Sequence, residues 1–246
     1  MISLLIRLAG HCMEIKTEHK GYRTIFADYC LPEDTEQIPE VTFEVSKEDA
    51  EAERALILAE QARLRSTYAL ELMALFRKIS SFLLEQGTLM IHGSGISYDG
   101  QGILFSAPSG VGKSTHVSYW QELFPEQVIV INDDKPLIRT DGESCLLCGT
   151  PWAGIRRLHR NAEIPLRVIC CLERGEENRV LPITAGEALP LLLQAVNRPS
   201  ERSDMDLVME AVQRVLKDTA FFRVQCTNSP EAAKIVQRAL SDAKLI

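Results

Sequence analysis

The segment Ala-Pro-Ser-Gly-Val-Gly-Lys-Ser-Thr at residues 107–115 constrains the fold of this chain more than any other feature. An apolar stretch at 103–106 precedes it and predicts a strand, and a helical pattern begins near Lys113. This order of strand, glycine-containing loop and helix matches the phosphate-binding loop Gly-x-x-x-x-Gly-Lys-Ser/Thr, with Ala107 at the first glycine position. Because such a loop lies between a strand and a helix, we expect an α/β domain.

Each residue type in this loop suits the binding of phosphate. Gly110 and Gly112 let the backbone curl so that successive N–H groups point at phosphate oxygens, and the following helix adds a partial positive charge at its N-terminus. Lys113 is placed to bridge the β- and γ-phosphates, and the Ser114 hydroxyl is placed to bind Mg²⁺. We therefore predict a site for ATP and Mg²⁺ that comprises Ser109, Gly110, Val111, Gly112, Lys113, Ser114 and Thr115.

Two adjacent acids, Asp133 and Asp134, follow the apolar stretch 128–131. An Asp-Asp pair is also a common turn signal, but two acids at the end of a buried strand are costly unless a cation or a ligand is near. Phosphoryl transfer needs one acid to hold Mg²⁺ and often another to orient or deprotonate the attacking hydroxyl. We therefore expect both aspartates to act in catalysis.

Four further polar or aromatic residues are candidates with two interpretations each. His92 follows the apolar residues 89–91 and is either structural or aimed at the phosphates. Trp152 either packs on a base or caps the core, and Arg156 and Arg157 either clamp phosphates or are solvated. We favour a ligand role for at least one of the two arginines.

Composition narrows the function classes. The net charge of −7 argues against a nucleic-acid binder, which would present a basic face to phosphates. No apolar run reaches the roughly 18 residues that cross a bilayer, and we expect neither a signal peptide nor a membrane partner, hence a cytoplasmic protein. The seven cysteines include one Cys-x-x-Cys pair, Cys145 and Cys148, without a second pair to complete a zinc site, so core cysteines are the favoured interpretation.

The pattern of the whole chain predicts two parts, an accessory region at 1–87 and a phosphate-binding-loop domain at 88–246. Residues 1–45 predict several strands, and residues 46–86 predict one long helix or two in succession, ended by Gly87. In the second part, strands are expected at 88–97, 102–107, 127–131, 136–139, 146–149, 166–172 and 221–226 and helices at 185–197, 204–218 and 230–243. The pair Asp99-Gly100 predicts a hairpin between the first two of these strands.

Together, these segments resemble the kinase domain of HPr kinase/phosphorylase, a member of the phosphoenolpyruvate-carboxykinase-like fold. The similarity covers roughly residues 88–240. It rests on the His-Gly pair at 92–93, the strand at 102–106, the loop at 109–114 and the Val-Ile-Asn-Asp-Asp stretch at 130–134. The later segments, at 149–154, 169–174, 178 and 192–199, look more like a group of short relatives.

The resemblance implies a fold, an activity and residue roles. It implies an α/β kinase domain with a mixed β-sheet, joined to a β-rich N-terminal segment and a long helix. Asp133 would accept the proton of the substrate hydroxyl, and Asp134 would support either the metal, together with Ser114, or the base. Lys113 would hold the phosphates, and His92 would lie beside the reacting phosphate.

The partners that the resemblance implies are a nucleotide and a protein or peptide that carries a serine. One departure stands out, because residues 149–157 read Gly-Thr-Pro-Trp-Ala-Gly-Ile-Arg-Arg where HPr kinase/phosphorylase has Glu-x-Arg-Gly-x-Gly. The phosphorylase reaction and HPr as substrate are therefore left open, as is a homo-oligomer. A small-molecule hydroxyl kinase and a nucleotide-binding regulatory protein with little turnover are the alternatives.

Overall fold

The computed structural model describes residues 1–59, 65–197 and 204–246. The chain falls into two compact units, Met1–Leu83 and Leu84–Ile246. The prediction of an α/β protein with a mixed sheet is confirmed. No helix within the described ranges is both long and apolar enough to cross a membrane.

The first unit begins with a three-stranded sheet in the order β1-β2-β3, formed by Ile2–Leu8, His11–Thr17 and Val41–Glu44. Strands β1 and β2 form an antiparallel hairpin whose turn residues Ala9 and Gly10 both have positive φ, 49° and 84°. Strand β3 pairs with β2 in parallel. The short helices α1, Tyr22–Ile25, and η1, Ala27–Tyr29, lie between them and were not predicted from the sequence.

Two helices complete the first unit, α2 at Lys47–Ala59 and α3 at Thr67–Glu85. The start of α2 is capped reciprocally, since Asp49 N–H donates to Ser46 Oγ at 3.1 Å and Ser46 N–H donates to Asp49 Oδ2 at 2.8 Å. The two-helix alternative for 46–86 is therefore the observed one among the described residues. Gly87, with a φ of 70°, follows the end of α3 as expected.

The second unit is built on a nine-stranded sheet with the order β4-β8-β9-β10-β6-β5-β7, in which β12 pairs with β10 and β11 with β12. Its strands are Thr88–Met90, Gly93–Tyr98, Gln101–Ser106, Val128–Asn132, Leu137–Arg139, Leu146–Cys148, Glu163–Arg174, Arg179–Pro182 and Ala220–Cys226, numbered β4 to β12.

One prediction about these strands was wrong, and one strand was not predicted. The expected strand at 88–97 is broken at residues 91–92, so that β4 pairs with β8 while β5 pairs with β6 and β7. Strand β11 was missed, because its four residues are mostly exposed and show no alternation. The hairpin at Asp99-Gly100 is confirmed, with positive φ at both residues.

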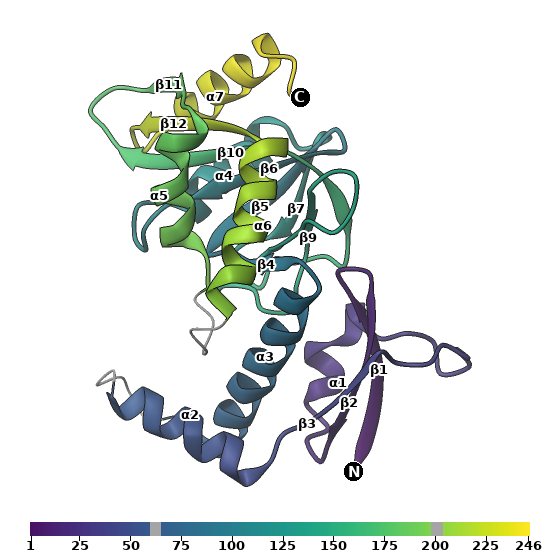
Figure 1. Ribbon diagram of the computed structural model, residues 1–246. Coiled ribbons are helices and arrows are strands. Elements are labelled where there is room, and N and C mark those ends of the chain that lie inside the picture. Colours follow the sequence, from purple (N-terminus) through teal and green to yellow (C-terminus); the bar gives the residue numbers. More distant parts are fainter. Residues whose placement is uncertain (60–64, 198–203) are drawn as a thin grey trace. The chain divides into compact units, whose positions relative to one another are not determined.

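Four helices cover the two faces of this sheet (Figure 1). Helices α4, Lys113–Leu123, and α7, Pro230–Asp242, pack against one apolar set that includes Phe105 and Cys170. Helices α5, Ala185–Ala195, and α6, Met205–Asp218, pack against the opposite set that includes Leu104 and Cys171. Helix α5 ends two residues before the expected 197, and the resemblance at 198–199 lies outside the described residues.

The strand directions gather the chemistry-bearing segments at one edge of the sheet. Strands β6, β10 and β12 are parallel to one another, and β7 has the same direction as β6 because both are antiparallel to β5. The carboxyl ends of these four strands therefore lie at one edge, together with the amino end of β5. The loop at 107–112, the acids at 133–134, residues 173–175, residues 226–228 and His92 all belong to that edge.

Candidate phosphate-binding site

The loop after β6 turns through two glycines with positive φ. Gly110 and Gly112 have φ angles of 81° and 119°, a region that side-chain-bearing residues rarely adopt. Helix α4 begins directly afterwards at Lys113. The Lys113 amine donates to the carbonyl oxygen of Ala107 at 2.8 Å, so the side chain folds back across the loop. Only 8% of this lysine is exposed.

The same lysine connects the loop to His92 and Asp134. Lys113 Nζ lies 3.1 Å from His92 Nε2, and His92 Nδ1 lies 3.2 Å from Asp134 Oδ1. An ammonium group only donates, so Nε2 accepts and the ring proton sits on Nδ1, facing the carboxylate. The three side chains thus form one hydrogen-bonded series from the loop to the acidic turn.

Burial and neighbouring charges shift the pKa values of the residues at both ends of this series. Burial lowers the pKa of Lys113, against the opposing effect of the Asp134 carboxylate. The hydrogen bond from His92 holds the pKa of Asp134 below its usual range, with further help from the charges of Lys135 and Lys113. Asp134 is therefore ionised at neutral pH.

Asp133 lies beside this series in a more enclosed position. It is 5% exposed, and its Oδ1 accepts a hydrogen bond of 2.7 Å from the N–H of Gly154. Gly154 faces the same carboxylate, and a Cβ there would make ordinary van der Waals contact with both Asp133 oxygens, at 3.4 and 3.5 Å. The turn at 154 therefore fixes the orientation of the Asp133 carboxylate.

Asn132, which sequence reasoning did not single out, holds the acidic turn in place. Its side chain is fully buried, and Oδ1 accepts hydrogen bonds from the N–H groups of Asp134 at 2.9 Å and Lys135 at 2.6 Å. Its amide Nδ2 donates to the carbonyl oxygens of Thr150 at 3.0 Å and Trp152 at 3.3 Å. One side chain thus ties the acidic turn to the segment that carries Gly154.

The two predicted arginines do not join this group. Arg156 donates to the Ser114 carbonyl at 2.9 Å and to Ser118 Oγ at 2.7 Å, so its guanidinium lies along α4. Arg157 is exposed and has a φ of 51°. Trp152 is partly buried, and its carbonyl accepts the bond from Asn132.

A different arginine reaches the loop. Arg174, at the end of β10, donates from Nη2 to the Gly110 carbonyl at 2.6 Å. It borders a cavity of about 450 Å³ on the α4 side of the loop, which we call the α4-side cavity. The residues that line this cavity are Gly110, Val111, Gly112, Thr115, His116, Tyr119, Arg174, Gly175, Cys226, Thr227 and Asn228. Arg174 lies in the segment 169–174 of the family resemblance but was not predicted as a ligand, because only the strand pairing brings it beside the loop.

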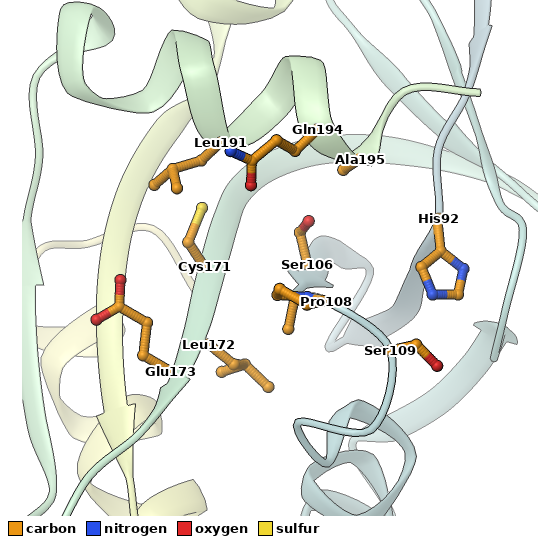
Figure 2. Close-up of a pocket in the computed structure, with 11 residues that line it drawn as sticks. His92, Ser106, Pro108, Ser109, Cys171, Leu172, Glu173, Leu191, Gln194 and Ala195 are labelled. Atoms are coloured by element: carbon orange, nitrogen blue, oxygen red, sulfur yellow. The ribbon is translucent and has the colours of Figure 1, made fainter. Parts of the chain in front are cut away.

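A second cavity, of about 480 Å³, opens on the α5 side of the same loop, and we call it the α5-side cavity. Figure 2 shows its lining, with His92 and Ser109 at one end and Glu173 at the other. The two cavities share no lining residue, so the loop separates them.

The structure therefore brings together most of the predicted residues. Ser109 and His92 border the α5-side cavity, while Val111, Gly112 and Thr115 border the α4-side cavity. Ser114 lies in the first turn of α4. The described cysteines are free, with Cys145 and Cys148 buried, and among the described residues no group of three or more His, Cys, Asp or Glu could hold a metal alone.

Comparison with known proteins gives a family and a set of solved structures, of which one is described here. No curated protein matches the chain. The solved structure of the HPr(Ser) kinase/phosphatase from Coxiella burnetii is 8% identical, with a TM-score of 0.37, and the match covers 63% of this chain and 96% of that one. The model of the family described as SynChlorMet cassette protein ScmC matches residues 57–227, most of the chain, and the protein therefore belongs to the ScmC family.

Proposed function

We propose that this protein is an ATP-dependent kinase that transfers the γ-phosphate to a serine-type hydroxyl on a protein or peptide. The observation that carries the proposal is the series Lys113–His92–Asp134, which ends on an acidic turn beside the glycine loop. A loop that only binds phosphate needs the lysine; a phosphoryl-transfer site also needs carboxylates within reach of the reacting group.

The two cavities suggest how ATP would lie. His92 borders the α5-side cavity and Lys113 Nζ lies 3.1 Å from its ring, so the γ-phosphate belongs at that side. The nucleoside then belongs in the α4-side cavity, where Tyr119 offers a ring and its hydroxyl donates to Asn228 Oδ1 at 3.1 Å. Arg174, already bonded to the loop carbonyl of Gly110, is the second cation for the phosphates in place of Arg156 and Arg157.

The oxygen donors at this edge suit Mg²⁺, which prefers hydroxyl and carboxylate ligands and keeps several waters. Ser114 and the ionised Asp134 are the residues that would hold it. When bound beside the phosphates, such an ion neutralises charge that develops on them during transfer.

Asp133 is the proposed base. Its Oδ1 is held by Gly154 N–H, so the carboxylate has a fixed direction. The acceptor hydroxyl oxygen forms a bond to the γ-phosphorus, the bond from that phosphorus to the β,γ-bridging oxygen breaks, ADP leaves, and the hydroxyl proton passes to Asp133. This chemistry applies equally to a small-molecule hydroxyl, which remains the second enzyme candidate.

The experiment separates binding from chemistry with single-residue variants of the full chain. Lys113→Ala should abolish or severely weaken ATP binding in calorimetry. Asp133→Asn should retain Mg²⁺-ATP binding but slow transfer roughly 10²–10⁴-fold, the usual contribution of a general base. Asp242→Asn, an exposed acid at the end of α7, is the matched control.

Three results would change the proposal. Unchanged nucleotide affinity in Lys113→Ala would remove the loop from the mechanism. Transfer lost in Asp134→Asn but kept in Asp133→Asn would exchange the roles of the two acids. If the wild type transfers phosphate to no acceptor and Asp133→Asn behaves like it in every respect, the protein is a nucleotide-binding regulator.

A further inference from the structure

The α5-side cavity has a composition that differs from that of the loop it adjoins. Its walls are mainly apolar and include Leu172, Leu191 and Ala195. The polar side chains are few: His92, Ser109 and Glu173 lie at its ends, buried Ser106 lies near its middle, and Gln194 extends from α5 (Figure 2). A ligand pocket of a few hundred Å³ with apolar walls and a few placed polar groups is the general form of a specificity site.

The location of this cavity assigns it to the phosphate acceptor rather than to the nucleotide. It shares His92 and Ser109 with the reacting end of the proposed site. Apolar walls disfavour a triphosphate, whose charge is better matched by the loop amides and by Lys113 and Arg174. The group that enters this cavity therefore belongs to the molecule that approaches the γ-phosphate.

The carboxylate at the end of the cavity away from His92 limits which side chains that molecule can carry there. Glu173 borders the cavity away from His92, and its Oε1 lies 3.4 Å from Arg223 Nε in a partly exposed ion pair. A carboxylate at this place repels acidic side chains, and it tolerates neutral or basic ones. The exposed amide of Gln194, on α5, can both donate to and accept from a peptide backbone.

We propose that the α5-side cavity binds a bulky apolar side chain at one fixed offset from the acceptor serine of a peptide substrate. Gln194 hydrogen-bonds the backbone of that segment, and Glu173 excludes acidic residues at the next position. This inference rests on the proposed kinase function and names the kind of sequence that the kinase recognises.

The test uses the full chain with a library of peptides that carry one central serine and one fixed residue at each flanking position, with γ-labelled ATP. Wild type should favour Leu, Ile, Met or Phe over Asp at one offset by roughly 10-fold or more, since a few methylenes in an apolar pocket discriminate by that amount. Leu191→Glu should lose this preference and gain one for Lys or Arg at the same offset. Leu181→Glu, an equally drastic change at an exposed site on β11, should retain the wild-type pattern.

A second variant keeps the inference testable if Leu191→Glu fails to fold, which circular dichroism would reveal. Glu173→Gln should transfer phosphate to peptides with an acid next to the apolar position several-fold faster than wild type does. Its ATP affinity should stay unchanged.

Five outcomes would overturn the inference. Wild type that labels peptides without any offset preference has no such pocket. If Leu191→Glu slows transfer to all peptides equally, or if Glu173→Gln still rejects acidic peptides, the cavity does not select peptides by their sequence. A Leu191→Glu variant that instead weakens ATP binding tenfold places the nucleoside in this cavity. Wild type that labels no peptide, while binding ATP, refutes the proposed function itself, and the inference falls with it.

Discussion

Replacing Asn132 should damage both the stability and the chemistry of the second unit. The Asn132→Ala variant deprives the N–H groups of Asp134 and Lys135 of their acceptor and the buried Thr150 of its donor. Each orphaned buried group costs about 1–3 kcal/mol. Because Asp134 and Lys135 are only half-buried, water can replace part of this loss, and we expect the free energy of unfolding to fall by about 3–5 kcal/mol.

The Asn132→Asp variant separates the two roles of this side chain, which accepts hydrogen bonds from the acidic turn and donates them to the segment near residue 150. It retains an acceptor for the turn but places a carboxylate against the carbonyl oxygens of Thr150 and Trp152. Such a buried carboxylate has a raised pKa, so its cost grows as pH rises above the value for an unfolded aspartate, about 3.9. The deficit relative to wild type should therefore narrow as pH falls from 7 towards 4.

Urea unfolding followed by fluorescence and circular dichroism would measure these losses, and transfer assays at 20 °C would measure activity. Asn197→Ala, at an exposed position, should stay within about 0.5 kcal/mol of wild type. Phosphate transfer by the folded fraction of Asn132→Ala should fall at least tenfold, because the acidic turn loses its anchor. A loss of stability below about 1 kcal/mol with unchanged transfer would refute this account of Asn132.

Three more predictions follow from other residues. Burial lowers the pKa of His116 to about 4. The unfolded state, with a histidine pKa of about 6.5, therefore takes up the proton first as pH falls. The free energy of unfolding should decrease by about 2 kcal/mol between pH 7.5 and 5, and this pH-dependent loss should be absent in His116→Gln. Arg174→Ala should weaken ATP binding roughly tenfold in calorimetry while Arg156→Ala changes it little, and the reverse order would restore Arg156 as the phosphate ligand. Gly149→Ala should prevent folding, as judged by circular dichroism, because its Cβ would lie 1.8 Å from the carbonyl oxygen of Arg160; a native spectrum would contradict this.

Local signals were sufficient to predict much of the fold around the site. The strand, loop and helix around Lys113 follow one another directly in the chain, and each carries its own pattern of apolar residues, glycines and hydroxyls. The hairpin at Asp99-Gly100 was predictable for the same reason, since the pair adopts the positive φ angles of a tight turn.

The remaining features depend on contacts between distant segments. The break at residues 91–92 follows from pairing with α5, since His92 N–H donates to the Ala195 carbonyl at 2.8 Å and Ile91 bridges Val196. Arg174 and Asn132 acquire their partners only when β10 and the segment near residue 150 lie beside the loop and the acidic turn. Arg156 carried the right charge at a plausible spacing, but α4 offers its guanidinium nearer acceptors.

The register shift in β10 has a consequence for the sign of the potential on the two sides of the sheet. Leu166 pairs with Gly102 and Val168 with Ile103, so Arg167 is an extra residue relative to β6. Side chains alternate between faces along a strand, and an inserted residue reverses that parity for everything that follows. Glu173 thereby faces one cavity and Arg174 the other. Deleting Arg167 would leave these pairs with β6 in place, so each cavity would keep its charged side chain, whereas a one-residue slip in the pairing of β10 would exchange the acid and the base between the two cavities.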